Sequence, residues 1–298
     1  MVRIQSVTIL KKFTDIYRKG FLIFDAVKFQ ESIFALPFAY SGMLLSHKSL
    51  PNYDDFIWVT LAMIGARTIG MSANRIIDHK IDLLNPRTAN RHIPKKLLRA
   101  RDLWVLSSLA LIIFLISSWK LNNLCLILAP FCAVYMLGYP FAKRLTWAGS
   151  FFLGWTLAIA PSAGWIAMTS KLSWEPVILS CAVASWATSF DILYHTQDHK
   201  FYINHGLHSV AQKFGIIRAF KISMALDILS VFCLISLGLL MELSAFYFIG
   251  CVATMFLLTY RHRMISPTNL SRINIAFMRI NAYISITMLI AIGLPIIL

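Results

Sequence analysis

The chain has 298 residues, of which 58% are hydrophobic and only 14% are charged, and its mean hydropathy is +0.68. A soluble domain carries about a quarter charged residues, so this composition excludes an ordinary soluble protein and favours an integral membrane protein. The formal net charge of +15 would suggest nucleic-acid binding if the positive residues were spread over the whole chain.

A membrane-spanning helix needs about 20 consecutive, mostly apolar residues. Nine segments meet or approach this length, so we predict an all-α, polytopic membrane protein with nine transmembrane helices. The predicted spans are 29–47, 54–77, 103–119, 121–141, 147–169, 174–194, 220–241, 243–260 and 277–298. We expect a single transmembrane domain over residues 29–298, preceded by an N-terminal arm over residues 1–28. The boundary between the third and fourth spans rests only on Lys120, Asn122 and Asn123.

The positive residues are distributed unevenly along this map. On one side of the membrane lie 23 of the 28 Lys and Arg residues, and only Lys48, Lys120 and Lys171 lie on the other. Short loops rich in Lys and Arg face the cytoplasm. We therefore predict a cytoplasmic N-terminus, cytoplasmic active-site loops and a bacterial inner (plasma) membrane location. The bias explains the net charge without a nucleic-acid partner.

The second predicted span ends in polar residues at helical spacing. Asn74, Asp78 and Asp82 recur at every fourth position and so share one face of a helix, with Arg67 deeper on the same face. Ionisable residues within a membrane are costly and are functional candidates by default. Carboxylates one turn apart suit Mg²⁺, which takes oxygen ligands and often shares them with substrate phosphates. The alternative is that this end of the helix simply emerges into water.

The sixth predicted span ends in a second polar stripe. Asp191, His195 and Asp198 share one helix face, with Tyr194 beside them, and Asp191 follows an uncharged run over 176–190. The spacing of the nearby histidines matches no zinc template, which favours neutral hydrogen-bonding or phosphate-contacting roles. Because both acidic stripes lie at cytoplasmic helix ends, we predict one metal–diphosphate site between the two halves of the chain.

Three motifs in order resemble those of the UbiA superfamily of intramembrane prenyltransferases, including its 4-hydroxybenzoate polyprenyltransferases. The first stripe resembles the NDxxDxxxD motif, and the second resembles the DxxYxxxD motif. Between them, Tyr139-Pro-Phe-Ala-Lys143-Arg144-Leu-Thr146 resembles the YxxxKRxT loop. The resemblance covers nearly the whole chain and implies two bundles of helices around a central cavity that opens sideways to lipid.

The resemblance also implies roles for particular residues. Catalysis would depend on the four aspartates Asp78, Asp82, Asp191 and Asp198, which with Asn74 would hold Mg²⁺. Three basic residues would bind the diphosphate: Lys143, Arg144 and Arg87. Three further residues would contact the acceptor or the allylic cation: Arg67, Tyr139 and Tyr194. For Arg67, a structural ion pair with a neighbouring helix is an equal alternative.

Two positions depart from the family pattern. Arg75 follows the first motif's Asn, where the family often has Asp, and Tyr202 replaces the final Asp of the second motif. Loss of that carboxylate leaves the number of metal ions open. Asn204, His195 or water could complete the coordination.

Other segments resemble one branch of the superfamily, the MqnP-like enzymes of the futalosine route to menaquinone. They include 28–39, Asn85-Pro-Arg-Thr88 and His205-Gly-Leu-His-Ser209. We therefore expect transfer of a polyprenyl group from an allylic polyprenyl diphosphate to an aromatic acid, either 4-hydroxybenzoate or a dihydroxynaphthoate, in ubiquinone or menaquinone biosynthesis. The alternatives are a transporter or lipid-binding membrane protein, and an inactive family member. Acceptor, prenyl chain length and oligomeric state stay open.

Overall fold

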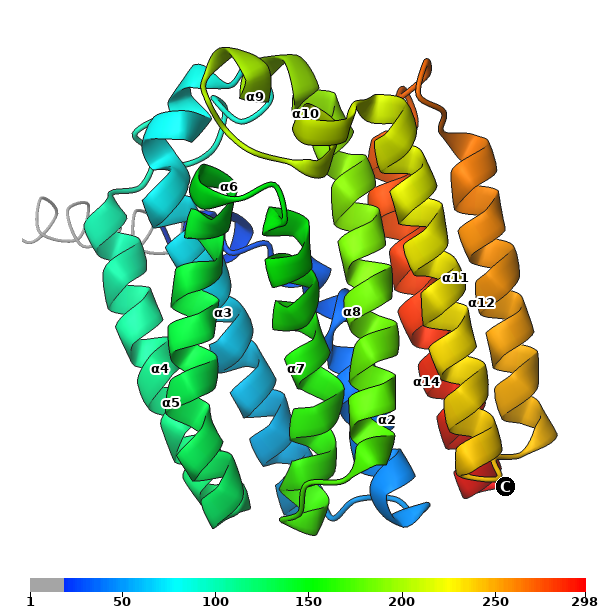
Figure 1. Cartoon of the computed structure of the whole chain (residues 1–298). Helices are drawn as coiled ribbons and strands as arrows, with labels where there is room; N and C mark the ends of the chain where they lie inside the picture. Colours follow the sequence, from blue (N-terminus) through cyan, green and yellow to red (C-terminus); the bar gives the residue numbers. More distant parts are fainter. Residues whose placement is uncertain (1–18) are drawn as a thin grey trace, which may run out of the picture.

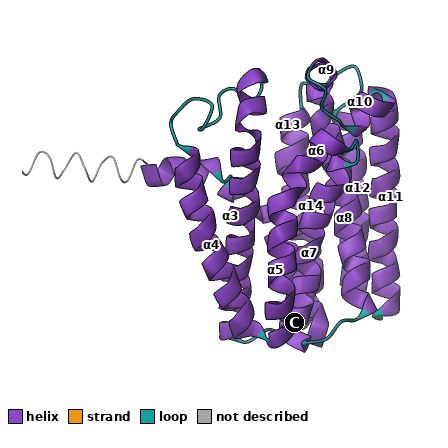
Figure 2. Ribbon diagram, turned by 60° about the vertical axis from the view of Figure 1, so that its left-hand side comes forward, coloured by secondary structure: helices purple, strands orange, loops and turns teal. Residues whose placement is uncertain are grey.

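The computed structural model describes residues 19–298, so the first 18 residues of the predicted N-terminal arm lie outside the described part. The described residues form helices and no β-strands, which confirms the all-α prediction (Figure 2). The first half contains η1 (Phe29–Phe34), α2 (Leu36–His47), α3 (Tyr53–Leu84), α4 (Ala100–Leu121), α5 (Asn123–Gly138), η2 (Tyr139–Phe141), α6 (Ala142–Leu145) and α7 (Gly149–Thr169). The second half contains α8 (Trp174–His195), η3 (Thr196–Asp198), α9 (His199–Asn204), α10 (Val210–Phe214), α11 (Ile216–Leu240), α12 (Ala245–Met264), α13 (Ile273–Ile275), η4 (Ala276–Ile280) and α14 (Asn281–Ile297).

Within residues 19–298, seven helical segments are long and apolar enough to cross a membrane, so the predicted count of nine is not confirmed. The two remaining predicted spans are shorter or more polar. Span 29–47 forms the 3₁₀ segment η1 followed by α2, which has only 12 residues and a length of about 18 Å. Span 243–260 corresponds to α12, which continues through Arg261, His262 and Arg263.

The weak boundary between the third and fourth predicted spans is a real helix break. At Asn122 the backbone is extended, and the side-chain oxygen accepts a hydrogen bond from the Cys125 amide at 2.9 Å, which caps α5. The Asn122 amide group also donates to the carbonyl oxygen of Ile166 at 2.8 Å. The Asn122 side chain therefore caps α5 and links the turn between α4 and α5 to α7.

The long helices stand side by side, with α3, α4 and α5 on one side and α8, α11, α12 and α14 on the other (Figure 1). Between them, α2 packs closely on α7. A Cβ atom at Gly42 would lie 2.1 Å from the Pro161 carbonyl oxygen, and one at Gly164 would lie 2.1 Å from that of Ala39. Only glycine permits this approach, which brings the two helix backbones into direct contact.

Large apolar side chains cover the outer faces of the helices, among them Ile112 on α4, Phe131 on α5, Phe232 on α11 and Phe256 on α12, all of them exposed. Apolar surface of this extent needs a lipid rather than a water environment. The chain is an integral membrane protein. The short helices α6, α9 and α10 lie together at one end of the bundle (Figure 1), and both acidic stripes lie at that end.

Candidate active site

The four predicted aspartates are all buried. Asp78 has no exposed surface, and Asp82, Asp191 and Asp198 are 3–5% exposed. The alternative that the first stripe simply emerges into water is therefore wrong. Because α3 continues without a break to Leu84, it carries Asn74, Asp78 and Asp82 on one face, as predicted.

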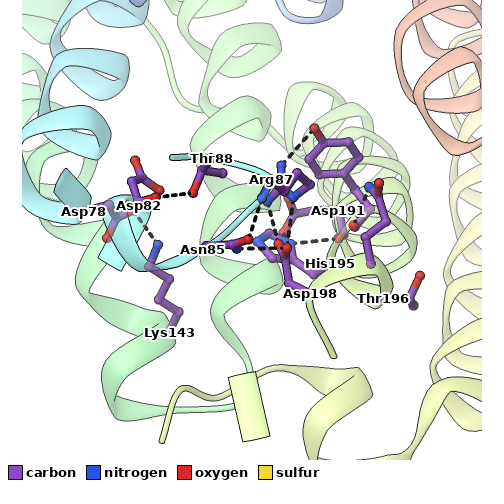
Figure 3. Close-up of polar contacts among 12 residues, drawn as sticks. Asp78, Asp82, Asn85, Arg87, Thr88, Lys143, Asp191, His195, Thr196 and Asp198 are labelled. Carbon is purple, nitrogen blue, oxygen red and sulfur yellow. Dashed lines mark hydrogen bonds and ion pairs between the residues drawn. The ribbon is translucent and has the colours of Figure 1, made fainter. Parts of the chain in front are cut away.

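The basic residues of the predicted loop motif reach Asp78. The Lys143 ammonium group donates to Asp78 Oδ2 (Figure 3). Arg144 lies 3.6 Å from Asp78 Oδ1 and donates to the Ile77 carbonyl oxygen at 2.6 Å. Asp78 Oδ1 is buried and has no hydrogen-bond partner. The turn over η2 and α6 thus places Lys143 and Arg144 beside the first stripe.

Asp82 binds a residue that the sequence analysis did not identify. Arg91 Nη1 donates to both carboxylate oxygens of Asp82, at 2.8 and 2.7 Å. Thr88 Oγ1 donates to the Asp82 backbone carbonyl at 3.1 Å. The loop over residues 85–99 therefore folds back onto the end of α3. Arg91 belongs to the positive run after span two, but its spacing from Asp82 follows no helical period.

The same loop also reaches the second stripe. Arg87 donates from Nε to Asp198 Oδ1 at 2.9 Å and from Nη2 to Asp198 Oδ2, and Asn85 Nδ2 donates to Oδ1 at 3.0 Å (Figure 3). Arg87 Nη1 donates to the Tyr194 hydroxyl at 3.1 Å. Burial lowers the pKa of Arg87, but the hydrogen bonds and negative charge of Asp198 outweigh burial and raise it above its usual value. Arg87 is therefore a permanent cation that joins the two halves of the chain.

Asp191 lies between two cavities. Its carboxylate Oδ2 is 3.1 Å from His195 Nδ1, which is also 3.0 Å from the Asp191 backbone carbonyl oxygen. Tyr202, which replaces a motif aspartate, is buried with its ring centroid 5.8 Å from that of His195. His195 and Tyr202 thus form one wall next to Asp191.

The smaller cavity, of about 60 Å³, brings Asn74 of the first stripe together with Asp191 and His195 of the second, whereas Asp78, Asp82 and Asp198 are not among its described lining residues. It is lined by Asn74, Lys143, Asp191, His195 and Tyr202, together with Tyr139. The larger cavity, of about 420 Å³, is mainly apolar and lies among α3, α4, α5 and α7, with further lining residues from η1, α2 and α8. Tyr139 and Asp191 line both cavities, so they stand where the polar pocket meets the apolar one.

The two predicted arginines on α3 take structural partners. Arg67 Nη2 donates to Glu31 Oε2 at 2.8 Å and to the Lys28 carbonyl oxygen at 3.3 Å, which matches the alternative of a structural ion pair. Arg67 nevertheless lines the larger cavity. Arg75 is buried and donates from Nε to the Ala26 carbonyl oxygen at 3.0 Å, so it anchors the segment before η1.

The oxygen-rich donors of both stripes fit Mg²⁺, which prefers carboxylate and amide oxygens. Asp78 Oδ1, which is buried and accepts no hydrogen bond, is the clearest such donor. In the described part of the chain, however, no three His, Cys, Asp or Glu side chains are grouped as a ready metal site. Each aspartate instead contacts basic or imidazole side chains: Lys143 and Arg144 for Asp78, Arg91 for Asp82, His195 for Asp191 and Arg87 for Asp198.

Comparisons with known proteins agree with this architecture. The model of the UbiA prenyltransferase family matches residues 35–283. The 4-hydroxybenzoate octaprenyltransferase of Aliivibrio salmonicida (strain LFI1238) is 28% identical over 225 residues, which cover 75% of this chain and 78% of the relative. The enzyme of the same name from Francisella tularensis subsp. novicida (strain U112) is 27% identical over 214 residues, or 71% of this chain and 74% of the relative.

Two solved structures share the fold. The apo structure of a UbiA homolog from Aeropyrum pernix K1 is 29% identical in sequence and superimposes with a TM-score of 0.77. The match covers 90% of this chain and 97% of the homolog. The structure of a UbiA homolog from Archaeoglobus fulgidus bound to DMAPP and Mg²⁺ matches with a TM-score of 0.64 over 89% of this chain and 98% of the homolog. Because its sequence is only 15% identical, it supports the fold alone. Because the family match spans most of the helical bundle and both halves of the site, this chain belongs to the UbiA prenyltransferase family.

Proposed function

We propose that this prenyltransferase transfers a polyprenyl group from an allylic polyprenyl diphosphate to an aromatic acceptor inside the membrane. The proposal rests on one observation above all. Lys143, Arg91 and Arg87 pair with aspartates of both acidic stripes, and Tyr139 and Asp191 join a small polar cavity to a larger apolar one. A diphosphate with an apolar tail needs both environments side by side.

The residues of the chain have distinct parts in this proposal. Mg²⁺, held by Asn74, Asp78, Asp82, Asp191 and Asp198, would supply positive charge that stabilises the leaving diphosphate. Lys143 and Arg144 would bind the phosphate oxygens, and Arg87, whose guanidinium holds Asp198, would add positive charge beside them. As the bond between the allylic carbon and oxygen breaks, its electron pair leaves with the diphosphate.

The apolar cavity protects the resulting allylic cation. Its walls exclude water, so the electron-rich ring of the acceptor is the nucleophile that can reach the cation. The ring carbon that forms the new bond would then lose its proton, which the released diphosphate can accept, and the ring would become aromatic again. Tyr139, which lines both cavities, would stand between the diphosphate and the reacting carbon. Tyr194 would act indirectly, by positioning Arg87. Its hydroxyl accepts a hydrogen bond from Arg87, and the guanidinium carbon of Arg87 lies 4.9 Å from the centroid of the Tyr194 ring.

The acceptor that we propose is an aromatic acid. The names of the relatives favour 4-hydroxybenzoate, whereas the motifs of the menaquinone branch favour a dihydroxynaphthoate. Either product would be a precursor of ubiquinone or menaquinone and would remain in the bilayer. We place the site at the cytoplasmic face of a bacterial inner membrane, because Lys and Arg gather in the loops on that side.

A transfer assay tests the proposal. Proteoliposomes are incubated with radiolabelled polyprenyl diphosphate, Mg²⁺ and either 4-hydroxybenzoate or a dihydroxynaphthoate, and extracted lipids are separated by chromatography. We expect a labelled prenylated product with at least one acceptor and none when the metal is removed with EDTA. If no aromatic compound yields a product while the protein remains folded, the proposed function is wrong.

A further inference from the structure

An ion pair lies in the wall of the large cavity. Glu31 on η1 and Arg67 on α3 lie 2.8 Å apart, with side chains 20% and 15% exposed. Both line the cavity, and the carboxylates among its described lining residues are those of Glu31 and Asp191. Asp191 contacts His195 and belongs to the proposed metal–diphosphate site. Glu31 is therefore the lining carboxylate that has no role in that site.

The pair leaves part of the arginine available. The hydrogen bonds of the Arg67 guanidinium within residues 19–298 come from Nη2, which serves Glu31 and the Lys28 carbonyl oxygen. Arg67 Nε is buried and has no hydrogen-bond partner. Since a guanidinium has N–H groups on all three nitrogens, Arg67 retains donor capacity beyond its bonds to Glu31 and Lys28.

Charge decides what the pair can bind. Glu31 already neutralises Arg67, so a carboxylate entering beside them would place a second negative charge next to Glu31 in an apolar cavity. Like charges repel strongly where the dielectric constant is low. A hydroxyl group avoids this cost, because it accepts a hydrogen bond from Arg67 and donates one to Glu31, whereas a carboxylate can only accept.

We propose that Glu31 is a specificity-determining residue, which makes this wall of the cavity bind an uncharged hydroxyl group of the acceptor and disfavour its carboxylate. The inference rests on the proposed function and deepens it. Arg67 without Glu31 would suit the carboxylate of an aromatic acid, and Glu31 changes that preference. An acceptor that also has a carboxylate must then direct that group away from the Glu31–Arg67 pair.

The test compares 4-hydroxybenzoate with its uncharged analogue 4-hydroxybenzamide. In Glu31→Gln the charge of Arg67 is no longer neutralised, so the preference for the acid, measured as the ratio of kcat/KM values, should rise at least tenfold over wild type. Glu175→Gln, at the far end of α8, should leave the ratio within twofold. The double variant Glu31→Gln/Arg67→Gln, which leaves no charge unpaired, should also return it to the wild-type value.

Binding separates this inference from the proposed function. Kd values for the acid and the amide, measured by calorimetry in detergent, should show the same tenfold change even if neither compound is prenylated. If Glu31→Gln does not survive extraction, Glu31→Asp, which withdraws the carboxylate by one methylene, should shift the ratio two- to fivefold in the same direction. An unchanged or lower preference for the acid in the folded variant overturns the inference.

Discussion

Asp78→Asn is expected to reduce prenyl transfer by about a thousandfold, which is roughly 4 kcal/mol of transition-state stabilisation. Asp78 is fully buried and contacts Lys143 through Oδ2, and its Oδ1 accepts no hydrogen bond. The amide would lose a negatively charged oxygen donor for the metal and leave the charge of Lys143 uncompensated. Turnover is measured in proteoliposomes at saturating Mg²⁺, with size-exclusion chromatography as the test of folding.

Asp54→Asn is the matched control for this variant. Asp54 lies exposed in the first turn of the same helix, at the opposite end from the site. Its activity should stay within twofold of wild type. A folded Asp78→Asn protein that keeps more than a tenth of wild-type activity would contradict the role assigned to the first stripe.

Asp198→Asn is expected to reduce turnover by at least a hundredfold, or about 2.7 kcal/mol. It weakens the double contact of Arg87 with Asp198, which joins the loop over 85–99 to the second half of the chain. Tyr202→Asp, which restores the carboxylate of the family motif, should change turnover by less than tenfold. The reason is that Asp191 and Asp198 remain in place to serve a metal shared with the first stripe.

Both variants are compared at saturating Mg²⁺ in the same assay. Tyr202 lines the small cavity together with Asn74, Lys143 and Asp191. The carboxylate introduced by Tyr202→Asp would therefore lie within the proposed metal–diphosphate site. A large gain from Tyr202→Asp would mean that the natural site lacks a carboxylate that it needs. Equal losses in the two variants would instead mean that Asp198 has no special role.

Helical spacing predicted the acidic stripes well. Asn74, Asp78 and Asp82 share a face because α3 runs unbroken past the last of them, and Asp191 is buried as the uncharged run before it indicated. The meeting of Lys143 with Asp78 could not come from periodicity, because it depends on the turn through η2 and α6. The motif resemblance, and not the spacing, assigned Lys143 to the site.

Spacing failed where an irregular loop or a tertiary ion pair decides the contact. The loop over 85–99 brings Arg91 to Asp82 and Arg87 to Asp198, and no repeat in the sequence encodes either pair. Arg261 is one of the 23 Lys and Arg residues that the topology prediction assigns to the cytoplasmic side. The structure buries it inside α12, where it donates to Asp227 at 2.6–2.7 Å. A charge satisfied within the bundle cannot be distinguished by sequence from one at the membrane surface.

The central claim is that both halves of the chain hold one metal–diphosphate site. Its most direct test is binding of an unreactive polyprenyl S-thiolodiphosphate to the purified protein, with and without Mg²⁺. We predict that Mg²⁺ tightens binding at least tenfold in wild type. That gain should disappear in Asp78→Asn and equally in Asp198→Asn, although the two residues come from opposite halves of the chain. A Mg²⁺ gain that survives in either variant, or that is absent from the wild-type protein, would contradict the claim.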